Sequence, residues 1–394
     1  MKKNRKVIHY KKDSYFDSKK KMTPLKWVGS IALILVLAFI GWNSFEPVMN
    51  FLNDFKNKIG NDEVSSEVIV ESSDISEAWE EISSNSEYSS EEPIKEKVKK
   101  DRSVYIPTEY MTDFEKAFDY FKVKAEKYGD INSITIYLKD DLGQIYLPVK
   151  NDIALEKEAV MENSTKIADT MVRFKEKGIS VNGIVSVFKD PKIPSLDPKF
   201  QIMYLNSGIA WIDNDPKNGG KQWLNPYSPY SIEYIINLAK EFYELGADKL
   251  IFDNIMFPAG FSLELAHYDY AEGRSRQQAI SDFSEKINKS FDKDKFTFMV
   301  HGENAAYPNE LVYGGNHLNA FKNNVMLVIS PDKLRENFVL AGESYKGGQS
   351  IQEYMGIFKE HYPEIFSDES FSLGFYEKDV NEEDCRDILN LLIV

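Results

Sequence analysis

The chain is poor in the residues that build disulfides and metal sites, with one cysteine and five histidines among 394 residues. A single cysteine, Cys385, excludes an internal disulfide, so stability must come from the core. The scattered histidines show no metal-ligand spacing. The motifs H-E-x-x-H, C-x-x-C, G-x-x-x-x-G-K-S/T and G-x-S-x-G are also missing. We therefore predict neither a metal nor another cofactor.

Acidic residues outnumber basic ones outside the N-terminus. The net charge is −15, although residues 1–26 hold ten Lys/Arg against two Asp. That segment is thus +8, and the remainder of the chain carries −23. An acidic body offers little to a phosphate backbone, so nucleic acid is not an expected partner. The basic segment suits the anionic lipids of the inner membrane leaflet.

Charge is absent from residues 27–45, a run of nineteen mostly apolar residues. This is about the length that a helix needs to cross the hydrocarbon core. Trp27 and Trp42 lie near its ends, and the basic residues before it predict a cytoplasmic N-terminus. We expect a single-pass protein of the cell membrane with an extracellular C-terminal domain. A cleaved signal peptide is the alternative.

Lys and Arg are also missing from residues 61–92, which contain eleven Asp/Glu and ten Ser. Such a segment cannot bury enough apolar surface to offset its ordering entropy, and this predicts a disordered spacer. The expected organisation is a cytoplasmic tail over 1–26, a transmembrane helix over 27–45, a Ser/Glu-rich linker over 46–100 and a folded domain over 101–394.

Strand and helix patterns alternate from residue 101 onward. This alternation implies parallel strands joined by crossovers, and about eight strands predict an α/β fold, a (β/α)8 TIM barrel. A doubly wound open sheet is the alternative, but no G-x-G-x-x-G follows the first strand. Asn206 to Gly208 suggest a hairpin turn. Strands are predicted over 103–107, 131–141, 179–190, 249–253, 295–303, 324–330, 337–342 and 371–379, with a final helix over 382–392.

Acidic side chains follow several of these strands, at the end where barrel enzymes place their chemistry. Asp253 ends the fourth strand and Glu303 follows the fifth. Glycoside hydrolysis needs a carboxylic acid and a carboxylate, and adjacent strands can bring two such groups to about 5 Å, the spacing of a retaining enzyme. Both residues are candidate catalysts, and structural carboxylates are the alternative. The sequence leaves a retaining or an inverting mechanism open.

Other polar and aromatic residues near the predicted strand ends are candidates for substrate binding. Aromatic faces stack on sugar rings while the polar handles of Trp and Tyr keep a partner in water. Packing within the core or the hairpin is the alternative for the aromatic residues. Asp140, Asp141 and Asp190 are interpreted as rim or turn residues rather than catalysts. The candidates are Asp190, Trp211, Trp223, Asn225, Tyr227, Asn254 and His301.

Four blocks of the sequence form a recognisable pattern: "SVYIPTEY", "INSITIYLKDDLGQIYLP", "KEKGISVNGIVSVFKDPKI" and "WLNPYSPYSIEYIINLAKEFYELGADKLIFDNIMFP". With these blocks the chain resembles the DUF4015 family of glycoside-hydrolase-like proteins, remote relatives of the α-amylase-type barrels, over roughly residues 101–330. The resemblance implies a (β/α)8 barrel related to polysaccharide-active enzymes, with Asp253 as nucleophile and Glu303 as acid/base.

The chain also departs from the family pattern. The usual "FDYIRFP" reads "FDNIMFP" here, so Asn254 and Met256 replace a tyrosine and an arginine. The lost arginine removes a donor that could keep the neighbouring carboxylate ionised. The second strand has Tyr137 and Leu138 where the family usually has an acidic residue, and the sixth-strand block "PMVYPSHY" is reduced to "LVISPDKL".

Two hypotheses follow from these patterns. The first is a membrane-anchored extracytoplasmic glycoside hydrolase that acts on cell-wall or surface polysaccharide. The second is a catalytically degenerate barrel that binds glycan or serves as a cell-envelope scaffold. The sequence leaves the glycan, its linkage and the oligomeric state open.

Overall fold

The computed structural model describes residues 101–380, 385, 388 and 390–394. The predicted cytoplasmic tail, transmembrane helix and Ser/Glu-rich linker lie outside this part of the chain. Within it, no helix is both long enough and apolar enough to cross a membrane.

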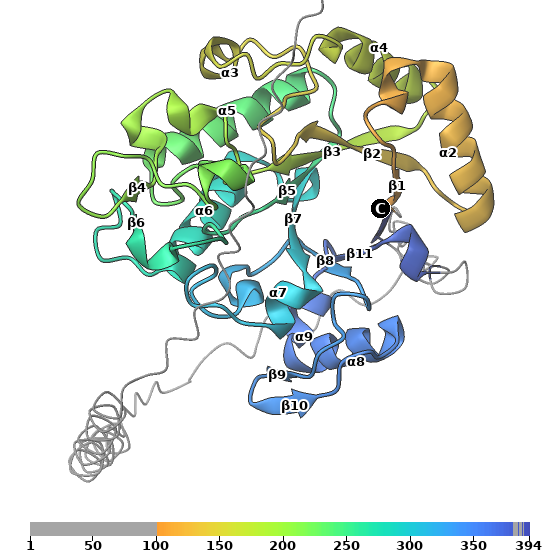
Figure 1. The fold of residues 1–394 in the computed structure, drawn as a ribbon. Coiled ribbons are helices and arrows are strands. Elements are labelled where there is room, and N and C mark those ends of the chain that lie inside the picture. Colours follow the sequence, from red (N-terminus) through yellow and green to blue (C-terminus); the bar gives the residue numbers. More distant parts are fainter. Residues whose placement is uncertain (1–100, 381–384, 386–387, 389) are drawn as a thin grey trace, which may run out of the picture. The chain divides into compact units, whose positions relative to one another are not determined.

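Eight parallel strands close into a barrel, which confirms the predicted fold class (Figure 1). Each strand pairs in parallel with both neighbours, and the last closes against the first. In barrel order the strands are β1 (Asp101–Tyr105), β2 (Ser133–Lys139), β3 (Ser180–Ser186), β5 (Lys249–Asp253), β7 (Phe296–His301), β8 (Val325–Ile329), β11 (Ser372–Phe375) and β12 (Asn390–Ile393).

Helices surround this barrel (Figure 1). Their ends follow from local sequence: Ser228 caps α5 directly before Pro229, and Ser275 forms a capping box with Gln278 at the start of α6. The α-helices are α2 (Phe114–Tyr128), α3 (Asp152–Glu156), α4 (Ser164–Glu176), α5 (Pro229–Glu244), α6 (Arg276–Ser290), α7 (Gly302–Ala306), α8 (Ile351–His361) and α9 (Pro363–Phe366). The 3-10 turns are η1 (Tyr110–Thr112), η2 (Ile193–Ser195), η3 (Pro198–Phe200), η4 (Pro216–Asn218), η5 (Leu263–Leu265), η6 (Lys293–Lys295), η7 (His317–Ala320) and η8 (Glu377–Asp379).

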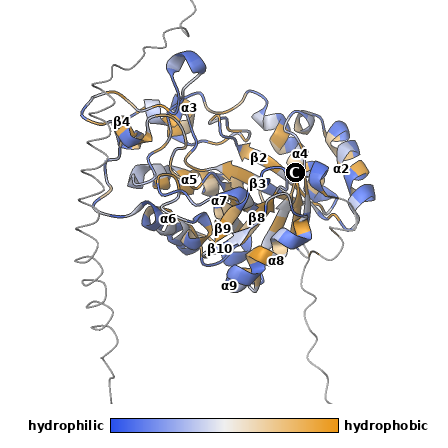
Figure 2. Cartoon of the chain, turned by 60° about the horizontal axis from the view of Figure 1, so that its bottom comes forward, coloured by the Kyte–Doolittle hydropathy of each residue, from blue (hydrophilic) through white to orange (hydrophobic). Residues whose placement is uncertain are grey.

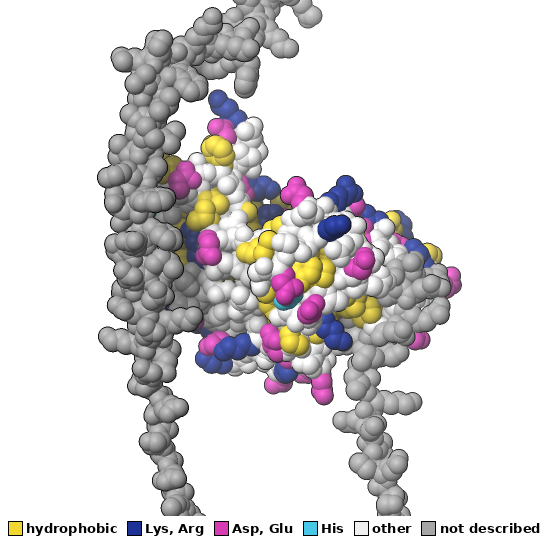
Figure 3. Space-filling view, turned by 90° about the horizontal axis from the view of Figure 1, so that it is seen from below, with side chains coloured by type: hydrophobic (Ala, Val, Ile, Leu, Met, Phe, Trp, Pro, Cys, Tyr) yellow, Lys and Arg dark blue, Asp and Glu magenta, His cyan; other side chains and the backbone are white. Residues whose placement is uncertain are grey.

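The main core lies between the strands and the inner faces of the helices, and a second apolar layer fills the barrel. Figure 2 shows hydrophobic strands at the centre and hydrophilic residues on the outer helices. Figure 3 shows acidic and basic side chains interspersed on the face seen from below, without an extended patch of one sign. The layer inside the barrel consists of Ile184, Ile251, Met299, Met326, Val328 and Leu392.

The last part of the barrel differs from the prediction. The strand predicted over 337–342 is wrong as a barrel strand, because β9 (Phe338–Leu340) pairs only with β10 (Glu343–Tyr345), in a separate antiparallel sheet. Residues 372–375 supply the seventh strand, and the eighth, β12, includes residues 390–392, the last part of the predicted final helix. A short buried apolar run does not distinguish strand from helix by its periodicity.

The long excursion after β3 carries a turn near the predicted hairpin position. The N–H of Tyr204 donates to the Ile209 carbonyl at 2.9 Å, and Asn206 adopts a left-handed φ of 56° in the turn. The strand before this turn, β4 (Met203–Tyr204), also pairs antiparallel with β6 (Ala266–His267). The loops after β3 and β5 are therefore joined at the carboxyl side of the barrel strands.

Candidate active site

Asp253 is the last residue of β5, and the residue is only 7% exposed. Both carboxylate oxygens are bound by the residue that follows. The Asn254 backbone N–H donates to Oδ1 at 2.6 Å, and the Asn254 amide Nδ2 donates to Oδ2 at 3.3 Å. Asn254 has a φ of 53°, a left-handed conformation that asparagine tolerates better than most residues.

His301, the last residue of β7, forms an ion pair with Asp253. Its Nε2 lies 3.4 Å from Asp253 Oδ1. Burial raises the pKa of Asp253, but the hydrogen bond and charge of His301 outweigh it and lower that pKa below its usual value. Burial lowers the pKa of His301, but Asp253 outweighs it and raises that pKa above 6.5. Each partner thus favours the charged form of the other.

Glu303 lies in the first turn of α7, two residues after His301. The structure therefore places Asp253 and Glu303 at the same end of adjacent strands. Glu303 Oε1 forms an ion pair with Lys333 Nζ at 2.8 Å. The other oxygen, Oε2, is buried and has no hydrogen-bond partner among the described residues. A general acid must carry a proton, whereas this ion pair uses the carboxylate form.

His317 was not identified from the sequence, yet it supports the loop that follows Asp253. Its Nε2 lies 2.9 Å from the Ile255 carbonyl, and its ring stacks on Tyr313 with 4.6 Å between centroids. Burial lowers the pKa of His317 to about 4. The imidazole is therefore neutral at physiological pH and donates to the carbonyl from Nε2–H.

Asp190 does not face a substrate, contrary to the expectation. It forms an ion pair with Lys139 at 3.0 Å, and both side chains have zero exposure. The backbone N–H groups of Lys192 and Ile193 donate to Asp190 Oδ1. The buried charges require each other, so this carboxylate is structural.

Asp140 and Asp141 occupy the rim and turn positions predicted for them. Asp140 Oδ1 accepts the backbone N–H groups of Leu142 and Gln144 in the turn after β2. Asp141 forms a surface ion pair with Lys189 at 2.7 Å.

The predicted aromatic platform does not present exposed faces. Trp211, Trp223 and Tyr227 are 0%, 3% and 5% exposed, because they pack between the loops after β3 and β5. Asn225 is also fully buried and donates to the Asp269 carbonyl at 3.1 Å. These four residues hold the loops together, so the three aromatic rings do not offer the stacking faces that were expected, and Asn225 binds a loop carbonyl instead.

Three tyrosines that were not selected from the sequence lie against the apolar layer inside the barrel. Tyr105 ends β1, Tyr137 is in β2 and Tyr376 follows β11; all three are partly buried over the apolar layer inside the barrel. Tyr105 and Tyr137 meet edge to face at 5.7 Å between centroids. Burial, and next the charge of Asp253, raise the pKa of Tyr137. Each lies inside a predicted strand rather than at its end, so reasoning from strand ends does not find them.

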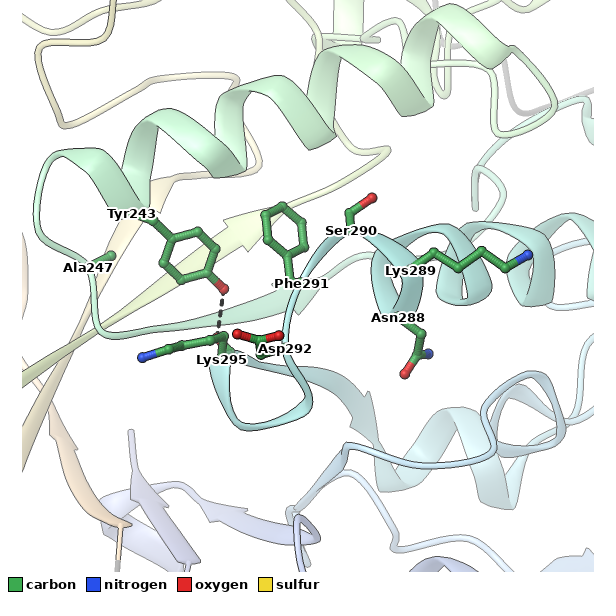
Figure 4. Close-up of a pocket in the computed structure, with 8 residues that line it drawn as sticks. All are labelled: Tyr243, Ala247, Asn288, Lys289, Ser290, Phe291, Asp292 and Lys295. Carbon is green, nitrogen blue, oxygen red and sulfur yellow. Dashed lines mark hydrogen bonds between the residues drawn. The ribbon is translucent and has the colours of Figure 1, made fainter.

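A pocket at the opposite end of the strands is separate from these groups (Figure 4). It includes Ala247, just before β5, and Lys295, just before β7. Tyr243 crosses it and donates its hydroxyl to the Lys295 carbonyl at 2.7 Å. Among the residues that the structure describes, no group of three or more His, Cys, Asp or Glu is arranged to hold a metal ion.

Comparison with known proteins gives a family match over residues 103–330, to the DUF4015 model described as "Putative glycosyl hydrolase domain". No curated protein matches the chain. A solved structure of a hypothetical protein from Ruminiclostridium thermocellum is 25% identical, with 50% of this chain and 96% of that chain covered and a TM-score of 0.43.

Two further solved structures are similar at lower identity. The glycoside hydrolase domain of PelA from Pseudomonas aeruginosa is 10% identical, with 70% of this chain and 83% of that chain covered and a TM-score of 0.35. A noncanonic maltogenic α-amylase, AmyB from Thermotoga neapolitana, is also 10% identical, with 75% and 66% covered and a TM-score of 0.40.

Proposed function

The chain belongs to the DUF4015 family of glycosyl hydrolase domains, and from that membership we propose that it hydrolyses glycosidic bonds in a cell-wall or surface polysaccharide. The observation that carries the proposal is the ion pair between Asp253 and His301, at the carboxyl end of the barrel strands and beside Glu303. A carboxylate kept ionised in a nearly buried position is suited to attack an anomeric carbon or to direct a water molecule.

Asp253 is the proposed nucleophile or base, and Glu303 is the proposed acid. Glu303 must first leave Lys333 in order to hold a proton. The Lys333 side chain is 48% exposed, so it can move away without opening the core. Substrate entry would separate this pair, after which Glu303 can protonate the leaving oxygen.

Tyr105, Tyr137 and Tyr376 replace the buried tryptophans as the proposed sugar contacts. All three residues are partly exposed and lie at or near the carboxyl ends of their strands, and Tyr376 also lies beside Lys333, whose Nζ is 3.4 Å from the Tyr376 hydroxyl. Ring faces of this kind provide apolar area for a sugar, and the hydroxyls provide hydrogen bonds.

Membrane anchoring through residues 27–45 is part of the proposal and rests on the sequence. It would place the barrel outside the cytoplasm, where a wall or surface polysaccharide is accessible. Protease treatment of intact cells tests this directly. We expect cleavage of the C-terminal domain from outside, and protection of that domain until lysis would contradict it.

The function is tested with the full chain in mild detergent against a panel of cell-wall and surface polysaccharides, with new reducing ends as the readout. Wild type should release product from at least one polysaccharide, and Glu303→Gln should slow release by about a hundredfold or more. Equal rates in the two proteins would remove Glu303 from the mechanism.

The ion pair with Lys333 also favours the second candidate, a barrel that binds glycan without cleaving it. In that case wild type would retain a polysaccharide on a pull-down resin and release no product. Lys333→Met distinguishes the two functions, because it frees Glu303 in a hydrolase but leaves a binding protein without product.

A further inference from the structure

A chain of hydrogen bonds runs from β3 to the candidate nucleophile. Ser186 is the last residue of β3 and lies opposite Asp253 in the strand register. Its side chain is fully buried. The Ser186 hydroxyl donates to the Lys189 carbonyl at 3.0 Å, which leaves its lone pairs to accept Asn254 Nδ2 at 3.1 Å.

Asn254 connects this hydroxyl to both oxygens of Asp253. The Asn254 amide contacts Ser186 Oγ and Asp253 Oδ2, while the Asn254 backbone N–H contacts Asp253 Oδ1. Asn254 has a left-handed φ of 53°, and in this conformation its own side-chain amide meets the preceding carboxylate. The carboxylate plane is thereby set with Oδ1 toward His301.

The Ser186 end of this hydrogen-bond series is held by buried residues. Lys139 Nζ donates to the Ser186 carbonyl at 2.8 Å and pairs with Asp190 at 3.0 Å. Because neither charged side chain is exposed, the position of the Ser186 backbone is fixed by buried interactions. Movement of Ser186 would break a bond to a buried ammonium group.

We propose that Asn254, held by Ser186, is a positioning residue that fixes the Asp253 carboxylate in the orientation facing His301. Asn254 supplies two donors to the carboxylate at the end of this strand, where the family pattern has an arginine nearby, and Ser186 accepts from the Asn254 amide. The catalytic part of the inference rests on the proposed hydrolase function, because only a reacting carboxylate needs this orientation for turnover. The geometric part concerns Asp253 and His301 alone.

Two variants interrupt this series of hydrogen bonds at different points. Ser186→Ala removes the hydroxyl that holds the amide, and Asn254→Gly removes the amide but keeps the left-handed backbone accessible. Asn206→Gly is the matched control, because Asn206 has nearly the same φ, 56°, in an exposed turn of the excursion after β3. Ser186→Thr retains a hydroxyl and tests for rescue.

The first readout is the titration of His301 by NMR in the full chain labelled at its five histidines. Ser186→Ala and Asn254→Gly should both move the His301 pKa down toward its ordinary value, because the carboxylate no longer faces the imidazole. Asn206→Gly should leave it unchanged, and Ser186→Thr should restore it. An unchanged His301 titration in both folded variants would overturn the positioning role.

The second readout is turnover of whichever polysaccharide the wild type cleaves. We expect kcat to fall by about tenfold to a hundredfold with little change in KM. Unchanged kcat in both variants would overturn the catalytic part. If the wild type cleaves nothing while the His301 titration still shifts, the hydrolase proposal fails and the positioning of Asp253 stands.

Discussion

Replacing Lys139 with methionine tests how much the buried Lys139–Asp190 pair beneath the site contributes to the free energy of unfolding. The Lys139–Asp190 pair is 3.0 Å long with zero exposure on both sides, and Lys139 also binds the Ser186 carbonyl. Methionine fills most of the lysine volume but leaves the Asp190 carboxylate buried without its counter-charge. Loss of one partner of a buried pair costs about 3–5 kcal/mol. This is a large share of the roughly 5–15 kcal/mol that holds a typical domain folded.

The assay is urea unfolding of the full chain, monitored by circular dichroism. Lys189→Met is the matched control, because the Lys189–Asp141 pair is 2.7 Å long with side chains 35% and 45% exposed. An exposed pair contributes up to about 1 kcal/mol. Lys139→Met combined with Asp190→Asn should cost less than the sum of the single changes, since no unpaired charge remains. A loss in Lys139→Met no larger than in the control would refute the reasoning.

Three further predictions concern pH and packing. Because the pKa of Asp253 is lowered and that of His301 is raised, their pair should stabilise the fold fully near pH 5. That contribution is lost as pH falls through the Asp253 pKa or rises through the His301 pKa, and Asp253→Asn should flatten the measured pH profile of unfolding. His317 stays neutral down to about pH 4 in the fold, whereas it takes up a proton near pH 6.5 when unfolded. As pH falls between these two values, the free energy of unfolding of the wild type should therefore decrease by about 3 kcal/mol, and that of His317→Gln should not. Gly183→Ala should lower the free energy of unfolding, measured in urea, by about 1–3 kcal/mol, because the added Cβ would lie 2.2 Å from a carbon of the buried Leu138 side chain. Gly356→Ala is the control: its Cβ would meet open space on α8, so it should raise that free energy by about 0.5–1 kcal/mol.

The barrel was predictable because most of its strands have clear local signals. The fourth strand begins and ends where predicted, at residues 249 and 253, since an apolar run stops at a charged residue there. The final strands were harder. Residues 391–393 are apolar on both faces because this part of β12 is buried, so the sequence shows neither helical nor alternating periodicity.

The site was predictable only in part. Topology alone brings Asp253, His301 and Glu303 to one end of adjacent strands, which strand-end reasoning anticipates. The partners of these groups depend on side-chain geometry. Lys333 reaches Glu303 from a loop thirty positions away, and nothing in the local sequence indicates that contact.

Burial explains the failure of the aromatic prediction. Trp211 and Trp223 lie in a polar, glycine-containing stretch that suggests exposure, yet the loops after β3 and β5 close over them. Burial of a large indole ring stabilises the fold, whereas an exposed ring contributes only when a ligand is bound. The ring N–H groups of Trp211 and Trp223 both donate to protein acceptors.

The rate of reducing-end release by Asp253→Asn, relative to Asp141→Asn, tests the central claim most directly. Both substitutions remove one carboxylate charge and keep the shape of the side chain, but Asp141 lies in a surface ion pair. If Asp253 is the reacting carboxylate, its variant should lose about a hundredfold or more in rate while Asp141→Asn retains wild-type turnover. Equal turnover in the two variants would contradict the assignment of the active site.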